Sequence, residues 1–292
     1  MISPIFESQA DEKTKEVYQQ IKQAFSVAKP PIFFCYLAPF YEYFSYIATQ
    51  IITNLKNEKF IEIINETKRI ILKLIKENLK KSEETNEFLN RFKHSPQFFY
   101  FQKDLEKIFD ANLKLTFIFI ALREAVKGWA IAARKIGAKT EAASFSSKPK
   151  IDEEEFIFNL NEVIDLNKQT KTKQKDIQSF SSALINVPFS TIEKDFLLFY
   201  LQLCRNDFCL ILKKEEYVFI RLEIEKIILR FLTLLPELIV SPVNLVIEMT
   251  KKYENYPELL YLLSEHFPTT VVQRLMFSGY MIEQPLLLKK LF

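Results

Sequence analysis

The spacing of apolar residues along the chain predicts helices from one end to the other. Val17, Ile21 and Phe25 recur every fourth residue, which places them on one side of a helix, and Asp11 just before them is a suitable N-cap. A later stretch repeats the pattern with Glu and Lys on the opposite face. Its apolar positions are Phe60, Ile64, Ile71, Leu74 and Ile75. Such amphipathic helices bury one face against a common core.

Proline, serine and glycine mark where several of these helices begin and end. The Pro30–Pro31 pair ends the first helix, and an aromatic segment follows it. The pairs Ser95–Pro96 and Ser241–Pro242 each combine an N-cap residue with a proline at the first helical position. A long helix opens at or next to Asn112 and ends at Gly137, because glycine favours the residue after a helix.

The two halves of the chain follow the same order of elements. Residues 68–73 read Lys-Arg-Ile-Ile-Leu-Lys, and residues 225–230 read Glu-Lys-Ile-Ile-Leu-Arg. In both halves a helix, a proline break, an aromatic segment, a long amphipathic helix, a Ser-Pro start and a closing helix follow one another. We therefore predict an all-α fold of two pseudo-repeated multi-helix halves, 1–137 and 176–292, joined by a linker over 138–175 with a short helix in it.

A duplicated unit of this kind leaves a central cleft along the seam between the halves. The aromatic segments that begin near Pro31 and Pro188, with the closing helices near Asn112 and Thr269, are predicted to line this cleft. The first segment carries more aromatic rings than one core face needs, Phe33 and Phe34 among them. Some of these rings must face a cleft or a partner subunit, which is compatible with a homodimer.

Composition narrows the class of protein. Hydrophobic residues make up 48% of the 292 residues, enough for a large core, and only 3 are glycine, which disfavours phosphate-binding loops and β-sandwiches. A net charge of +3 is too small to indicate nucleic-acid binding. The start of the sequence and its longest apolar run, 115–122, predict neither secretion nor membrane insertion. With 3 cysteines, the chain is expected to work reduced, in the cytoplasm.

Few side chains in the sequence indicate chemistry. His94 and His266 stand at turns without a second ligand at metal-binding spacing, so no metal site is predicted. Arg123 follows an apolar run and is a candidate for binding a carboxylate, although a pair with Glu124 on the helix surface explains it equally well. Glu193 and Asp195 stand near Phe196 and Phe199. Each is either a base whose pKa is raised or part of the solvent-exposed face of the segment.

The order of several weak motifs resembles the group I 2-haloacid dehalogenase family, which is DehI-like. These motifs are a helix with Tyr18 and Ile21, the segment Leu37-Ala38-Pro39-Phe40, Asn112-Leu113-Lys114, Ala121-Leu122-Arg123-Glu124, and a similar second half. The resemblance covers most of the chain. It implies an all-α fold of two pseudo-repeats and a hydrolase of short 2-halocarboxylic acids that needs neither a metal nor an organic cofactor.

In that family an Asp activates a water that attacks the α-carbon directly, and an Asn positions this water. Asn112 matches the Asn by context. The Asp is expected in the second half, ahead of the aromatic segment, where this chain has Pro188 in the run Val187-Pro188-Phe189. Because proline can take no proton, the resemblance leaves Glu193 and Asp195 as candidates for the base, with Phe33, Phe34, Phe189 and Arg123 around the acid.

Two other readings stay open. The first is a non-catalytic protein on the same scaffold that binds a small ligand or a protein partner, which would have no carboxylate within reach of Asn112. The second is a helical repeat scaffold for protein partners, which would show one long concave face.

Overall fold

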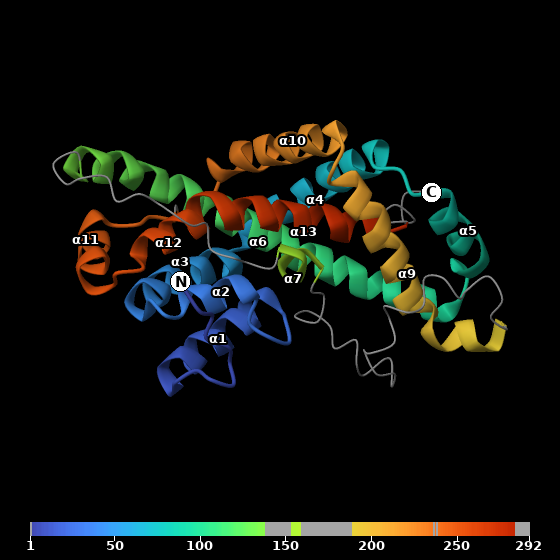
Figure 1. The fold of residues 1–292 in the computed structure, drawn as a ribbon, viewed down its shortest axis with the longest axis horizontal. Coiled ribbons are helices and arrows are strands. Elements are labelled where there is room, and N and C mark those ends of the chain that lie inside the picture. The colour runs from blue at the N-terminus through green and yellow to red at the C-terminus, as the bar shows by residue number, and fades with distance from the viewer. Residues whose placement is uncertain (1, 138–152, 159–188, 236, 238, 284–292) are drawn as a thin grey trace.

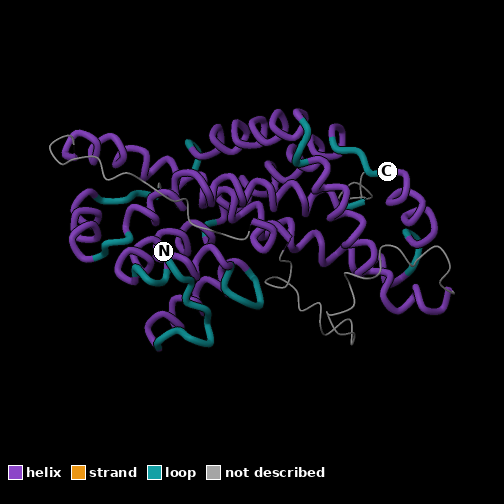
Figure 2. The backbone as a smooth tube through the Cα atoms, in the orientation of Figure 1, coloured by secondary structure: helices purple, strands orange, loops and turns teal. Residues whose placement is uncertain are grey.

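The computed structural model describes residues 2–137, 153–158, 189–235, 237 and 239–283, and within them every regular element is a helix (Figure 2). The elements are α1 (Glu12–Phe25), α2 (Ile32–Leu37), α3 (Tyr41–Lys56), α4 (Glu58–Asn78), α5 (Glu83–Phe92), α6 (Pro96–Gly137), α7 (Glu153–Phe158), α9 (Phe189–Ile211), α10 (Glu215–Leu232), α11 (Val243–Lys252), α12 (Tyr256–Tyr261), the π-helical turn η3 (Leu262–His266) and α13 (Phe267–Met281). The all-α prediction is confirmed.

Helices α6 and α13 form the centre of the molecule. Figure 1 shows α13 lying along the middle of α6, and this pair makes the most extensive helix–helix contact among the described elements. Helices α4, α7, α9 and α10 also pack against α13. Of the 15 residues of α13, 13 are buried, and a helix that is apolar on all sides belongs in a core.

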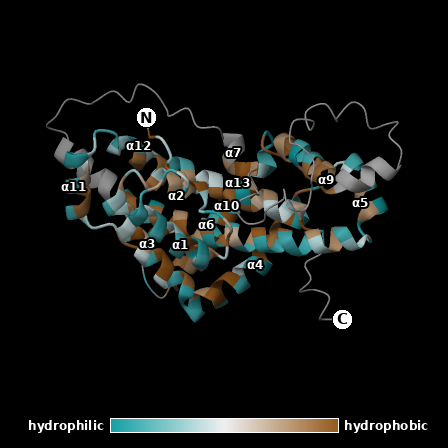
Figure 3. Cartoon of the chain, turned by 90° about the horizontal axis from the view of Figure 1, so that it is seen from below, coloured by the Kyte–Doolittle hydropathy of each residue, from teal (hydrophilic) through white to brown (hydrophobic). Residues whose placement is uncertain are grey.

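Several helix boundaries follow the sequence signals. The Asp11 side chain caps α1 by accepting a hydrogen bond from the Thr14 N–H at 2.8 Å, and Ser26 ends the helix in the left-handed conformation at φ 58°. Asn57 caps α4 in the same way. Figure 3 shows hydrophobic and hydrophilic residues alternating along the helices, as amphipathic elements require.

Several boundaries differ from those predicted. Helix α1 ends at Phe25, ahead of the Pro30–Pro31 pair. Asn112 does not open a helix, because α6 runs without a break over 42 residues from Pro96, and no glycine or proline interrupts it between 97 and 127. Ser241 does not cap α11, whose N-cap is Pro242. The Ser241 hydroxyl instead pairs with the Tyr43 hydroxyl at 2.9 Å, so a tertiary contact takes the side chain away from the helix end.

Pro268 stands in the first turn of α13, which continues a helical rod without a gap. Helix α12, the turn η3 and α13 follow one another without a gap, and the Phe267 N–H donates to the Leu262 carbonyl five residues back. A proline in a helix has no N–H and its ring collides with the preceding turn. The wider π-helical turn just ahead of Pro268 accommodates that ring. Such turns recur at functional sites.

Gly279 lets α13 approach its neighbours closely. A Cβ at this position would lie 2.7 Å from Ile75 Cδ1 on α4 and 2.9 Å from Phe109 Cε2 on α6. Both distances are below normal van der Waals contact, so a side chain at this position would force Ile75 and Phe109 to shift.

We expect Gly279→Ala to lower the free energy of unfolding by about 1–3 kcal/mol through overpacking, despite alanine's higher helix propensity. Ile75→Val removes the Cδ1 atom that stands nearest. The double variant is therefore expected to recover part of the loss. Urea unfolding of the four proteins measures this coupling, and additive effects of the two substitutions would show that the contact is not limiting.

None of the described helices is both long and apolar enough to cross a bilayer. Cys35 and Cys204 are buried, Cys209 is half-buried, and none of the three forms a disulfide. Burial raises the pKa of the Cys204 thiol to about 12. Because the thiolate is the reactive form, Cys204 is protected both by burial and by protonation.

A thiol-reactive dye at pH 8 should therefore label Cys209 first in the native protein. Cys35 and Cys204 should react only after the chain opens, and denaturant should expose all 3 thiols at once. Mass spectrometry of the labelled peptides assigns each site. Rapid native labelling of Cys204 would contradict the burial described here.

Candidate functional site

A buried pair of polar side chains joins α6 to α13. Asn112 is 0% exposed and Arg274 is 1% exposed. The Arg274 Nε donates to the Asn112 Oδ1 at 2.8 Å, and the Asn112 Nδ2 donates back to the Arg274 carbonyl at 3.5 Å. Two hydrogen bonds between the same two residues fix the side-chain amide and orient the guanidinium.

The other buried polar groups nearby bond to helix backbone. The Thr116 hydroxyl donates to the carbonyls of Asn112 at 2.7 Å and Val271 at 3.2 Å, and the Thr270 hydroxyl donates to the His266 carbonyl at 2.8 Å. Threonine hydroxyls in helices commonly bond to the preceding turn in this way. Arg274 is thus the charged group of this cluster. Burying a charge is costly, so its presence here favours a functional role over a purely structural one.

Phe33 forms an aromatic wall beside the guanidinium. The Arg274 Cζ lies 5.9 Å from the centroid of the Phe33 ring, within range of a cation–π contact. The rings of Phe119, Phe156 and Phe267 surround Phe33, with centroid distances of 5.1, 5.3 and 5.3 Å. These apolar neighbours lower the local dielectric and strengthen any ion pair that the guanidinium makes.

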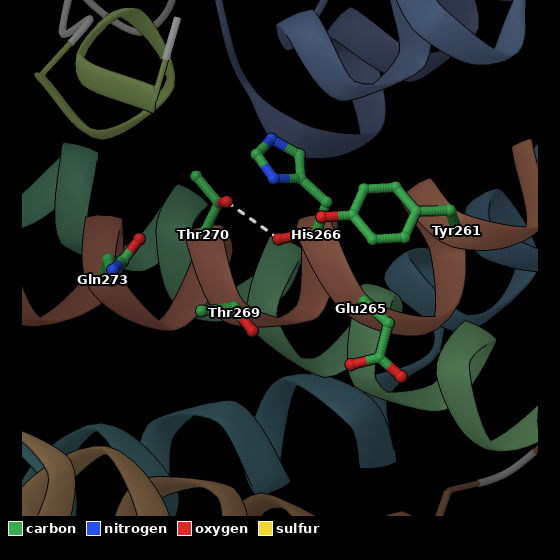
Figure 4. A pocket seen from close by; sticks show the side chains of 6 residues that line it. All are labelled: Tyr261, Glu265, His266, Thr269, Thr270 and Gln273. Atoms are coloured by element: carbon green, nitrogen blue, oxygen red, sulfur yellow. Dashed lines mark hydrogen bonds between the residues drawn. The ribbon is translucent and has the colours of Figure 1, made fainter. Parts of the chain in front are cut away.

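A small pocket opens on the rod formed by α12, η3 and α13 (Figure 4). Its volume is about 210 Å³, below the usual range for sites of drug-sized ligands. The side chains of His266 and Thr270 point to one side of the helix, and the Glu265 carboxylate points to the other. The lining residues are Tyr261, Glu265, His266, Thr269, Thr270 and Gln273. The pocket is polar and suits a small ligand.

The structure brings Phe33 and Asn112 together at this site and places Phe34 next to it. Phe34 packs in the core against Phe25, Phe44 and Phe119, at centroid distances of 5.6, 6.4 and 5.6 Å. Phe119 therefore connects Phe34 to Phe33.

Arg123 lies elsewhere, between α6 and α10. Its guanidinium donates to Glu124 at 3.0 Å and to the buried Glu225 at 2.7 Å. The helix-surface pair with Glu124, which the sequence offered as the alternative to carboxylate binding, is present. Two carboxylates already neutralise this arginine.

Phe189, Glu193 and Asp195 lie on the first turns of α9, and their side chains are outside the described part of the chain, as is Pro188. Figure 1 shows these turns, in yellow, at the end of the molecule near α5. Further along α9, Tyr200 donates to the Met281 carbonyl at 2.6 Å and so ties this helix to the end of α13.

The sequence interpretation missed Arg274. A basic residue within the apolar run 271–277 is a signal that could have found it, because charged residues are rarely buried without a partner. Among the described residues, no group of three or more His, Cys, Asp or Glu side chains is arranged to hold a metal ion.

Comparisons with known proteins bear on the fold. No family model matches the sequence, and no curated protein sequence matches it. A solved structure of a D-2-haloacid dehalogenase mutant in complex with D-2-CPA is similar, with a TM-score of 0.61 at 16% sequence identity. The match covers 97% of this chain and 95% of that chain. The resemblance to the group I 2-haloacid dehalogenases is thereby confirmed for the fold.

Replacing Asn112 with alanine should destabilise the protein by about 1–3 kcal/mol, because the buried Arg274 Nε–H loses its acceptor. Asn78→Ala is the matched control, since Asn78 is exposed and bonds only to the Leu74 carbonyl at 2.8 Å. Its effect should stay within about 0.5 kcal/mol. Urea unfolding followed by circular dichroism compares the two, and equal effects would rule out a special role for the Asn112–Arg274 bond.

Proposed function

We propose that this chain binds a short 2-halocarboxylic acid between α6 and α13 and hydrolyses its carbon–halogen bond without a metal or an organic cofactor. The observation that carries the proposal is the buried Asn112–Arg274 pair, on a fold shared along its length with a D-2-haloacid dehalogenase. A small carboxylic acid is the ligand whose charge is opposite to that of the guanidinium.

Arg274 supplies the recognition of the acid. A guanidinium presents its N–H groups in a fixed plane and binds a carboxylate through two parallel hydrogen bonds. Here the Nε is held by Asn112 and the Cζ lies 5.9 Å from the Phe33 ring centroid, so the plane is oriented before a ligand arrives. Pre-organisation of this kind favours binding, because less rotamer freedom is lost.

The proposed reaction is a direct displacement at the α-carbon. A carboxylate base, for which the sequence offers Glu193 and Asp195 as candidates, takes a proton from water, the water oxygen forms a bond to the α-carbon, and the halide leaves with the electron pair of the broken bond. The products are a 2-hydroxy acid, a halide ion and a proton that passes to solvent. In this scheme the Asn112 amide orients the water, while Phe33, Phe34 and Phe189 form the apolar surroundings.

The pseudo-repeat belongs to the same proposal. Helix α4 contacts α10, and α6 contacts α13. Each pair joins elements that the sequence aligns between the halves 1–137 and 176–292, so a pseudo-twofold relation would explain both contacts. The acid then lies at the seam, between the two closing helices, and the linker over 138–175 connects the halves. We place the protein in the cytoplasm, where thiols stay reduced, as its cysteines without disulfides suit.

Specific observations favour a second function, that of a non-catalytic protein that binds small carboxylic acids. Pro188 stands where the family resemblance implies the catalytic Asp, and the turns that carry Glu193 and Asp195 lie at the end of the molecule (Figure 1). The Asn112 Oδ1 also accepts a hydrogen bond from the Arg274 Nε, which uses one of the two lone pairs that could accept from water. Arg274 could still bind the acid if no catalytic base were present and Asn112 did not orient a water.

Chloride or bromide release from both enantiomers of 2-chloro- and 2-bromopropionate tests the reaction. We expect release by the purified protein above the buffer rate, reduced by Asn112→Ala and abolished by whichever of Glu193→Gln and Asp195→Asn removes the base. Calorimetric titration of the same acids tests recognition. Arg274→Lys keeps the charge but loses the bidentate geometry, so it should weaken binding by about tenfold or more.

The outcomes separate the two functions. Binding that depends on Arg274 without any halide release would establish the non-catalytic protein. Halide release that survives both carboxylate substitutions would leave the reaction standing and reject Glu193 and Asp195 as its base. The absence of both binding and release would reject the carboxylic acid as the ligand.

A further inference from the structure

The short helix α7 packs over the face of α13 that carries the site. Phe156 and Ile157 are buried, and α7 makes one of the larger contacts with α13 among the described elements (Figure 1). Six residues are too few for a stable isolated helix, so its position depends on these side chains. The linker between the halves therefore contributes directly to the core.

Phe156 contacts aromatic rings both at the pocket beside η3 and next to the buried Asn112–Arg274 pair. Its ring meets His266, which lines the pocket, edge-on at 5.5 Å. It also meets Phe33 at 5.3 Å, and the Phe33 ring lies beside the Arg274 guanidinium. One fully buried side chain thus contacts a ring at each of the two sites.

We propose that Phe156 is a specificity-determining residue that limits the length of the acid held at Arg274. This inference rests on the proposed function, because it places the carboxylate at Arg274 and directs the rest of the acid towards Phe156. With the phenyl ring in place, the acid is restricted to two or three carbons. Removing the ring joins the buried site to the pocket beside η3.

The lining of the pocket defines which longer acids would fit. Thr269 and Gln273 offer a hydroxyl and an amide, and the Glu265 carboxylate would repel a second negative charge. The opened site should therefore accept monocarboxylic acids with a neutral tail that ends in a hydroxyl or an amide, and it should reject dicarboxylic acids.

Phe158, two residues further along, provides a matched control on the same helix. Its ring packs against Phe277 at 4.8 Å and Phe208 at 6.4 Å, and Arg205 lies 5.0 Å from its centroid. These contacts are with α9 and the later part of α13. Truncation of Phe158 removes a ring of the same size without opening the wall beside Phe33.

Titration calorimetry with 2-chloroacetate, 2-chloropropionate, 2-chlorobutyrate and 2-chloro-6-hydroxyhexanoate measures the preference for length. Phe156→Ala should strengthen binding of the longest acid about tenfold relative to 2-chloropropionate, the gain expected for burying additional methylene groups. Phe156→Leu should lie between it and the natural protein, and this variant keeps the core filled if the alanine variant fails to fold. Phe158→Ala should keep the natural preference.

Histidine NMR gives a second readout that does not depend on turnover. The chain has 2 histidines, and His94→Gln identifies the remaining imidazole signal as that of His266. The hydroxyhexanoate should move the His266 signal in Phe156→Leu and Phe156→Ala but not in the Phe158→Ala protein. A length preference that is unchanged in both Phe156 variants, or that shifts equally in Phe158→Ala, would overturn the proposal. Failure of the natural protein to bind any of these acids would instead reject the proposed function and this inference with it.

Discussion

The packing of α13 against α6 is the constraint on which the other helices depend. Helix α13 is buried on nearly all sides, so the helices around it must fit closely against its side chains. Gly279 allows this close fit because it has no side chain, and α4 and α6 approach the space that a side chain would fill. Arg274 can be buried in the same helix because its Nε donates a hydrogen bond to the Asn112 Oδ1. Helices α4, α7, α9 and α10 then assemble around this pair.

The same constraint explains why the polar cluster can serve as a site. A guanidinium in the core stabilises the fold less than a well-packed apolar side chain of similar volume would. It becomes useful when a ligand of opposite charge reaches it in a low-dielectric setting, where the attraction is strongest. The proposed acid-binding function explains why Arg274 is buried despite the free energy required to remove its charge from water.

Local signals in the sequence predict the outer helices well. The cap at Asp11 and the stripe Val17, Ile21 and Phe25 define α1, because capping and amphipathic spacing depend only on neighbours in the chain. The π-helical turn was not predicted, because no signal in the neighbouring residues marks it. The continuity of α6 was not predicted either, although the absence of glycine and proline over 97–127 is consistent with it. The partner of Asn112 lies 162 residues away, so the sequence could single out Arg274 as a basic residue in an apolar run but could not pair it with Asn112. The roles of Glu193 and Asp195 remain predictions.

The late position of α13 in the chain has a consequence for biosynthesis. The apolar faces of α6 are complete once residue 137 has been made, but the helix that covers its middle ends at Met281. A ribosome adds roughly 5–20 residues per second, so these faces wait several seconds for their partner. During that interval the nascent chain exposes the apolar faces of a long helix, and chaperones that bind apolar segments are expected to bind it.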